Sequence, residues 1–153
     1  MDKEHSHKNK VHKILAHSYS AYFVFFLLGI CLDLIFKLKI FDNSIIVPLG
    51  FFFLFFATFL IVWAQKTSRK LNKENITKET FCKGPYCYTR SPTHWGLFFL
   101  MLGFGMITNA FFVILTTLIS FVVSKFIFLN RQERILAEKY GDPYLEYKKS
   151  VKL

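Results

Sequence analysis

Residues 84–96, with the sequence GPYCYTRSPTHWG, hold the densest group of side chains that could do chemistry. Gly84-Pro85 predicts a turn, and Tyr86 and Tyr88 follow it at once. Ser91-Pro92 favours a helix start, with serine as the N-cap and proline at the first helical position. The unpaired amides of a helix start can bind a carboxylate or a phosphate. The alternative is a capped helix start with interfacial tyrosines and no ligand.

A second polar segment, residues 130–151, follows the last apolar run and reads NRQERILAEKYGDPYLEYKKSV. Its apolar and aromatic residues recur at helical spacing, which predicts two short amphipathic helices separated by Gly141-Asp142-Pro143. Amphipathic helices of this kind lie along a membrane surface with their apolar side inward. We therefore expect the C-terminal segment to lie along the membrane face.

Glu133 is the acidic residue of this segment that stands nearest the end of the apolar run. We expect its carboxylate to face the region that holds Ser91 and Tyr86. The alternative is a structural ion pair between Glu133 and either Arg134 or Lys83. The two interpretations differ in whether the carboxylate is available to a ligand.

The cysteines lie at positions 31, 82 and 87, and their odd number does not indicate a disulfide framework. Cys82 and Cys87 with His94 imitate a metal site, but a structural zinc takes four ligands at tighter spacings. We expect free thiols and no metal, because this lysine-containing segment is predicted to lie in the reducing cytosol. The histidine-rich N-terminus, residues 1–17, is expected to be a solvated basic tail.

The composition is that of a membrane protein. Of 153 residues, 53% are hydrophobic and 19% aromatic, with 20 phenylalanines. A soluble domain of this size could not bury so much apolar surface. The net charge of +10 does not indicate nucleic-acid binding, because the basic residues flank apolar runs and no recognition motif is present.

The apolar runs predict an all-α integral membrane domain over residues 18–153. The run from Ser91 to Ser124 would extend roughly 50 Å as one helix, against about 30 Å of hydrocarbon. We expect it to form two helices in a tight hairpin, with the break at Asn109. The four predicted transmembrane helices cover about residues 18–38, 45–65, 92–108 and 110–129.

Lysine and arginine gather in the N-terminal tail, in the loop of residues 66–91 and in the tail of residues 130–153. The loop after the first predicted helix has only Lys37 and Lys39. With four spans, the three basic segments fall on one side of the membrane. The positive-inside rule assigns that side, and therefore both termini, to the cytoplasm.

Asp33 stands near the far end of the first predicted helix, and an acidic residue inside a membrane is a functional candidate. Lys37 lies four residues later, at a spacing that allows an ion pair on one helix face. We therefore expect an interfacial ion pair between Asp33 and Lys37.

The two polar segments resemble the signatures of a superfamily of membrane methyltransferases. GPYCYTRSPTHWG is similar to GPY-x-Y-x-RHP-x-Y-x-G, found in the isoprenylcysteine carboxyl methyltransferase and phospholipid methyltransferase superfamily. ERILAEKYGDPYLEYKKSV is similar to the ending E-R-x-L-x-x-x-FG-x-x-Y-x-x-Y-x-x-x-V of that superfamily. The resemblance covers roughly residues 55–151. It implies an integral membrane enzyme that methylates a lipid-borne acceptor with S-adenosylmethionine.

Most motif positions match and a few depart. Ser91 stands where the superfamily usually has histidine, and Gln132 stands where it usually has the first of two glutamates. His94 replaces a tyrosine one helical turn from Ser91 and is the candidate to substitute for the missing imidazole. The matching residues are Gly84, Pro85, Tyr86, Tyr88, Arg90, Pro92, Gly96, Glu133, Gly141, Tyr144, Tyr147 and Val151.

The resemblance implies a cofactor-binding loop at residues 66–91 and two candidate catalytic residues, Glu133 and Arg131. Glu133 is expected to bind the amino group or ribose hydroxyls of the cofactor, and Arg131 to orient an anionic acceptor. The faces of Tyr86 and Tyr88 are expected to stabilise the sulfonium by cation–π contact. The expected cofactor-binding residues are Gly84, Pro85, Tyr86, Tyr88, Arg90, Ser91, Pro92, His94, Gly96, Glu133, Tyr144 and Tyr147.

Two alternatives stay open. The KYG-x-x-Y-x-x-Y-x-x-x-V ending also resembles that of membrane sterol reductases, which use NADPH, although the GPY-x-Y-x-R-x-P segment favours the methyltransferases. The departures at Ser91 and Gln132 suggest, as a second alternative, a non-catalytic membrane scaffold that retains the fold. Prenylated cysteine carboxylates and phospholipid amines are the acceptors that the methyltransferase resemblance implies.

Overall fold

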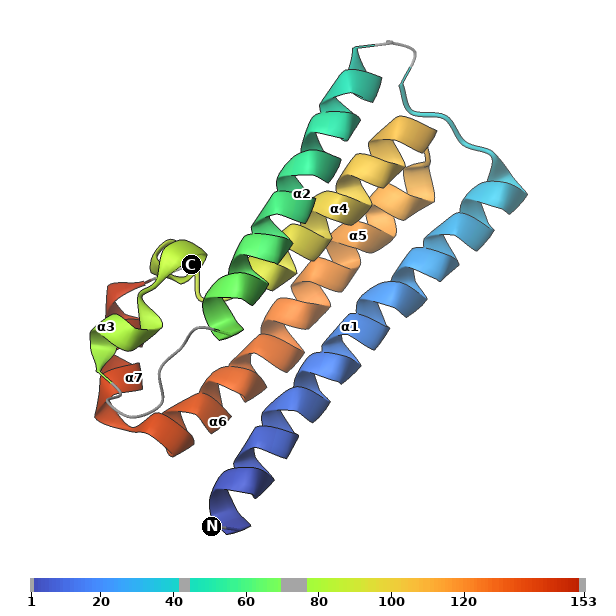
Figure 1. The fold of residues 1–153 in the computed structure, drawn as a ribbon. Helices are drawn as coiled ribbons and strands as arrows, with labels where there is room; N and C mark the ends of the chain where they lie inside the picture. Colours follow the sequence, from blue (N-terminus) through green and yellow to red (C-terminus); the bar gives the residue numbers. More distant parts are fainter. Residues whose placement is uncertain (1, 42–44, 70–76, 152–153) are drawn as a thin grey trace.

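The computed structural model describes residues 2–41, 45–69 and 77–151, and every regular element in these ranges is helical (Figure 1). The predicted all-α class is therefore confirmed. Parts of the predicted loop 66–91 and tail 130–153 lie outside the described residues. The elements are α1 (Asp2–Phe36), α2 (Ile46–Arg69), α3 (Lys78–Phe81), the 3-10 turn η1 (Gly84–Cys87), α4 (Pro92–Thr108), α5 (Phe111–Val123), the π-helical segment η2 (Ser124–Leu129), α6 (Asn130–Tyr140) and α7 (Asp142–Ser150).

Three stretches of helix in the described residues are long and apolar enough to cross a membrane. They are Ala16–Phe36 in α1, Ile46–Ser68 in α2, and Phe111–Tyr140, which runs through α5, η2 and α6. The third predicted span, about residues 92–108, corresponds to α4, which has 17 residues and is not among these three. The first of the two predicted C-terminal helices is thus a continuation of α5 rather than a separate element.

Helix α1 begins much earlier than predicted. We expected a solvated tail over residues 1–17 and a helix from about Ser18, but α1 starts at Asp2. Residues 2–17 contain neither glycine nor proline. Nothing therefore interrupts a helix that extends backward from the apolar segment, where each added residue gains a backbone hydrogen bond.

Helices α2, α4, α5 and α1 lie side by side in that order, and these four run in alternating directions along the chain (Figure 1). Glycines permit the closest approaches. A Cβ atom on Gly103 of α4 would lie 2.7 Å from the carbonyl oxygen of Gly50 in α2, and one on Gly29 of α1 would lie 2.9 Å from the Cα of Val113 in α5. Small residues at helix contacts are typical of membrane helix pairs, whose association depends on close packing.

Asn109 joins the end of α4 to the segment that follows α1. It ends α4 in the left-handed conformation, with φ 52°, so the predicted break falls at this residue. Its side-chain oxygen accepts the N–H groups of Ile40 and Phe41, each at 3.0 Å, and its side-chain amide donates to the Phe41 carbonyl at 2.7 Å. One side chain thus satisfies three backbone groups outside the helices.

The predicted ion pair between Asp33 and Lys37 is wrong. The Asp33 carboxylate instead accepts the backbone N–H groups of Phe112 (3.0 Å) and Val113 (2.9 Å), in the first turn of α5. Lys37 lies beyond the end of α1 with φ 49°, so the helical spacing on which the prediction rested does not apply. Unpaired amides and the positive end of the helix dipole favour a carboxylate at the start of α5.

The substitution Asp33→Ala should lower the free energy of unfolding by about 1–2 kcal/mol, since it removes a carboxylate that caps α5. Lys37→Ala should leave stability unchanged. Unfolding of the purified protein in mild detergent, followed by circular dichroism, measures both. An ion pair between the two residues would instead make the two losses similar.

Candidate functional site

A buried carboxylate paired with two cations lies at the end of the helices where η1, α6 and α7 meet. The Glu133 Oε1 atom lies 2.7 Å from Arg90 Nη1, and Oε2 lies 2.8 Å from Lys148 Nζ. The Glu133 side chain is 7% exposed. We call Arg90, Glu133 and Lys148 the ion triad. It joins the loop before α4, helix α6 and helix α7.

Helical spacing places Glu133 on the inner face of α6. Leu136, Ala137 and Tyr140, at three, four and seven residues beyond it, pack against the buried aromatic cluster of α7. Arg134, one residue on, points outward and pairs at 3.4 Å with Glu138, with both side chains exposed. The predicted alternative pairing of Glu133 with Arg134 or Lys83 is therefore wrong.

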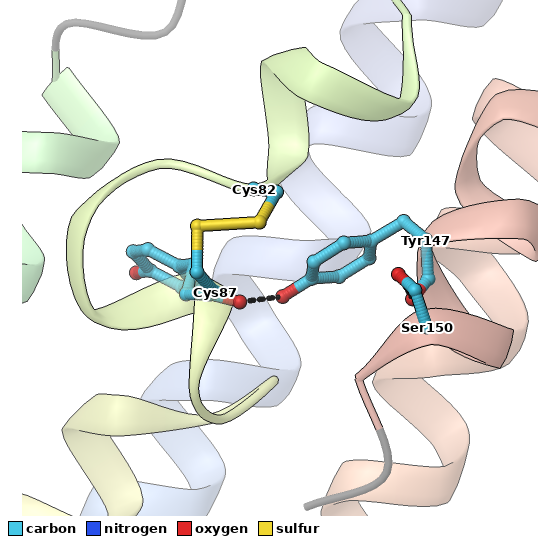
Figure 2. Close-up of a disulfide and its surroundings, with 5 residues drawn as sticks. Cys82, Cys87, Tyr147 and Ser150 are labelled. Atoms are coloured by element: carbon cyan, nitrogen blue, oxygen red, sulfur yellow. Dashed lines mark hydrogen bonds between the residues drawn. A yellow bond between two sulfur atoms is a disulfide. The ribbon is translucent and has the colours of Figure 1, made fainter.

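Tyrosines from η1 and α7 surround the ion triad. Tyr144 and Tyr147 are buried and pack against Phe81, and the Tyr147 hydroxyl donates a hydrogen bond of 2.7 Å to the Tyr86 carbonyl (Figure 2). Burial raises the pKa of Tyr147 to about 12, and it also raises the pKa values of Tyr86 and Tyr144. These phenols are therefore neutral at physiological pH and act as hydrogen-bond donors.

The turn η1 is closed by a disulfide between Cys82 and Cys87 (Figure 2). The prediction of free thiols at these positions is wrong, because η1 reverses the chain and brings the two Cα atoms to 4.5 Å. Sulfurs bonded to each other are not thiolate ligands, so this pair cannot form the metal site that was considered with His94. The disulfide encloses Tyr86, whose carbonyl receives the Tyr147 hydroxyl.

Alkylation of the unfolded, non-reduced protein should modify Cys31 alone, because Cys31 is the free cysteine of the described structure. Reduction before alkylation should add label at Cys82 and Cys87. Mass spectrometry of the peptides distinguishes the two states. Full labelling of all three cysteines without a reductant would contradict the disulfide.

The structure brings Tyr86, Tyr144 and Tyr147 together with the ion triad. Tyr88 points away from it and is 76% exposed. Arg131 is also exposed, and it lies two residues from Glu133, on a different face of α6. The expected roles of Tyr88 and Arg131 therefore find no support in their positions.

The predicted glycines and prolines shape the backbone around the site. Gly84 has φ 55°, and a Cβ atom there would lie 2.7 Å from Thr67 Oγ1, so the start of η1 packs tightly on α2. Pro85 is buried in η1, and Gly96 lies in the contact between α4 and α2. Pro92 begins α4 as predicted.

Ser91 and His94 face a different neighbour from the ion triad. Ser91 occupies the N-cap position of α4, but its hydroxyl makes no capping hydrogen bond. His94 is buried against α1, where its ring centroid lies 6.1 Å from that of Tyr19 and 5.9 Å from that of Tyr22. The expected cofactor residues thus divide into two groups, one around Glu133 and one around His94.

A groove of about 300 Å³ lies between α2, η1 and α4. We call it the aromatic groove, because its walls include Phe56, Phe59, Trp63, Trp95 and Phe99. Pro85 and Tyr88 form the part of its wall that belongs to the η1 region. Its composition suits a hydrocarbon chain, and it adjoins the turn that carries Tyr86.

None of the site residues Lys148, Tyr22 and Ser124 was predicted from the sequence. Lys148 follows Tyr144 by four residues, so its position on the same face of α7 was a usable signal. Ser18 and Tyr22, also four residues apart, are both buried although most of α1 around them is exposed apolar surface. Polar residues at helical spacing on an apolar helix mark the face that contacts protein.

The model of the phospholipid methyltransferase family matches residues 23–143, which is more than half of the chain. The chain belongs to the phospholipid methyltransferase family. The match contains Arg90 and Glu133, and it ends just before the aromatic cluster of α7. No curated protein and no solved structure matches the chain. Family membership and the three long apolar helices identify an integral membrane protein, and the family favours a methyltransferase over a reductase.

The substitution Glu133→Gln should lower the free energy of unfolding by about 3 kcal/mol, because it removes the buried carboxylate that faces both the Arg90 guanidinium and the Lys148 ammonium. The matched control is Glu138→Gln in the exposed pair with Arg134, for which the expected loss is below about 1 kcal/mol. Denaturant unfolding in detergent micelles measures both. Equal losses would show that the ion triad carries no special stability.

Proposed function

We propose that the chain transfers a methyl group from S-adenosylmethionine to a lipid-borne acceptor, next to the ion triad. One observation carries the proposal: a buried carboxylate held between two cations lies at the end of membrane-type helices, within a chain of the phospholipid methyltransferase family. Buried charges are costly to a protein and concentrate where a charged ligand must be bound.

The donor groups of the site fit the charges of S-adenosylmethionine. Arg90 and Lys148 would hold its carboxylate, Glu133 would accept hydrogen bonds from its ammonium or ribose hydroxyls, and the rings of Tyr144 and Tyr147 would stabilise its sulfonium. The bound cofactor supplies an electrophilic methyl group. The remaining task of these side chains is alignment, which by itself can lower a barrier by several kcal/mol.

The aromatic groove supports a lipid as the second substrate. Its volume of about 300 Å³ lies at the lower end of ordinary ligand pockets. It lies along α2 and α4, so an apolar chain in it would remain at the depth of the membrane while its polar end approaches η1. Lipid and cofactor would then reach the site from different phases.

We further propose that α1, α2, α4 and α5 cross the bilayer as four spans, with both termini in the cytoplasm. The basic residues of the N-terminal tail, of the loop 66–91 and of the tail 130–153 support this orientation. Glu133 would then lie at the cytosolic end of the helices, on the side where the cofactor is made. A disulfide is rare in a cytosolic segment, so alkylation of Cys82 and Cys87 in intact cells also tests this orientation.

Purified protein in lipid nanodiscs should bind radiolabelled S-adenosylmethionine saturably and transfer label to a total lipid extract. The substitution Glu133→Gln should reduce binding at least tenfold, whereas Glu138→Gln should bind as the unaltered protein does. Circular dichroism of each variant checks that the helices are intact. Binding that is absent in the unaltered protein, or equal in both variants, would refute the proposal.

A further inference from the structure

A small cavity lies where α1, α4 and η2 meet. Its volume is about 20 Å³, and its polar lining comes from Tyr22, Ser91, His94, Ser124 and Lys125. A space of this size holds one water molecule or one polar group of similar size. We call it the His94 pocket.

The polar groups of the His94 pocket other than the exposed Lys125 are buried. His94 is 6% exposed, and Tyr22 and Ser124 are each 2% exposed. The Ser124 hydroxyl is hydrogen-bonded at 2.8 Å to Ser18 of α1. In contrast, neither ring nitrogen of His94 has a hydrogen-bond partner among the described residues. Leaving such a group unsatisfied costs about 1–3 kcal/mol, and a leucine or phenylalanine would fill the space without that cost.

The helix opposite His94 is irregular at this point. The π-helical segment η2 starts at Ser124, which lines the pocket, and ends at Leu129, which lines it as well. Single π-turns inside α-helices occur frequently at functional sites. The irregular turn therefore lies beside the same pocket as the imidazole whose nitrogens lack a partner among the described residues.

The His94 pocket adjoins the ion triad on two sides. Ser91 follows Arg90 directly in the chain, and Glu133 stands one helical turn beyond Leu129. A group in the pocket would therefore lie next to whatever the ion triad binds, on the side of the membrane helices. That is the side from which a lipid arrives.

We propose that the His94 pocket receives the nucleophilic atom of the methyl acceptor and that His94 accepts its proton. This inference rests on the proposed function and names the acceptor class: a lipid-borne amine, alcohol or thiol. A carboxylate has no proton to lose, so it would not need a base at this position.

The transfer balances in atoms and charge. The acceptor lone pair forms a bond to the methyl carbon while the carbon–sulfur bond breaks, and the bonding electrons stay on sulfur as a neutral thioether. The proton of the acceptor passes to a ring nitrogen of His94. The positive charge of the sulfonium is thus replaced by that of the imidazolium, which returns its proton to water after product release. A positioned general base contributes about 10²–10⁴-fold to such a reaction.

Binding without any cofactor provides the first test. Dodecylamine, dodecanol and dodecanethiol in nanodiscs should raise the melting temperature of the unaltered protein more than dodecanoic acid of the same chain length. The substitution His94→Phe, which keeps the shape of the ring, should abolish this difference. His94→Gln, which keeps hydrogen-bonding groups, should retain it. A preference for dodecanoic acid, or an unchanged preference in His94→Phe, would overturn the proposal.

Measurements of turnover distinguish a role of His94 in accepting the proton from a role in packing alone. With labelled S-adenosylmethionine and the preferred acceptor, His94→Gln should reduce kcat about 100-fold with KM nearly unchanged, and it should remove the fall in rate at low pH. The other titratable groups that face the imidazole are Tyr19 and Tyr22 of α1 and Lys125 of η2. His17→Gln, at an exposed position of α1, is the matched control and should keep full activity. Full kcat in His94→Gln would overturn the proposal.

The two proposals fail in distinguishable ways. Absence of S-adenosylmethionine binding in the unaltered protein and in every variant would refute the proposed function. The melting temperatures with the alkyl ligands would still test the His94 pocket. Saturable cofactor binding together with full activity in His94→Phe would refute the role of His94 alone.

Discussion

The charge of Glu133 is the constraint on which this end of the molecule depends. A carboxylate removed from water loses several kcal/mol of hydration, which only close counter-charges can offset. Arg90 and Lys148 supply them from segments far apart in sequence. The loop before α4, helix α6 and helix α7 must therefore converge. The hydrogen bond from Tyr147 to the Tyr86 carbonyl joins α7 to η1, the turn that the disulfide closes.

The two ends of the helix layer are held by different means. At the end far from the ion triad, Asp33 and Asn109 bind backbone groups of neighbouring segments through several hydrogen bonds. Near the His94 pocket, α1 contacts η2 through the hydroxyl pair of Ser18 and Ser124, and the rings of Tyr19 and Tyr22 lie against His94 of α4. Polar and aromatic side chains therefore hold α1 at this end, and backbone hydrogen bonds hold it at the other.

The sequence predicted the helical class, the break at Asn109 and the family, because apolar runs and short motifs are local signals. It also indicated that Glu133 approaches Tyr86. It could not identify Lys148 as the partner of Glu133 or α5 as the partner of Asp33, since both contacts join distant segments. The cysteines were misread because their pairing depends on how η1 turns, and spacing alone does not determine that turn.

The π-turn in η2 also fixes the phase between two parts of one long helix. Each residue of an α-helix advances the side chains by about 100°. The wider turn between Ser124 and Leu129 therefore sets which face of α6 looks inward, and that face carries Glu133. Deletion or insertion of one residue in η2 would rotate Glu133 away from Arg90, although no residue of the ion triad would be replaced. The number of residues in η2 is therefore as important to the geometry of the ion triad as their identity.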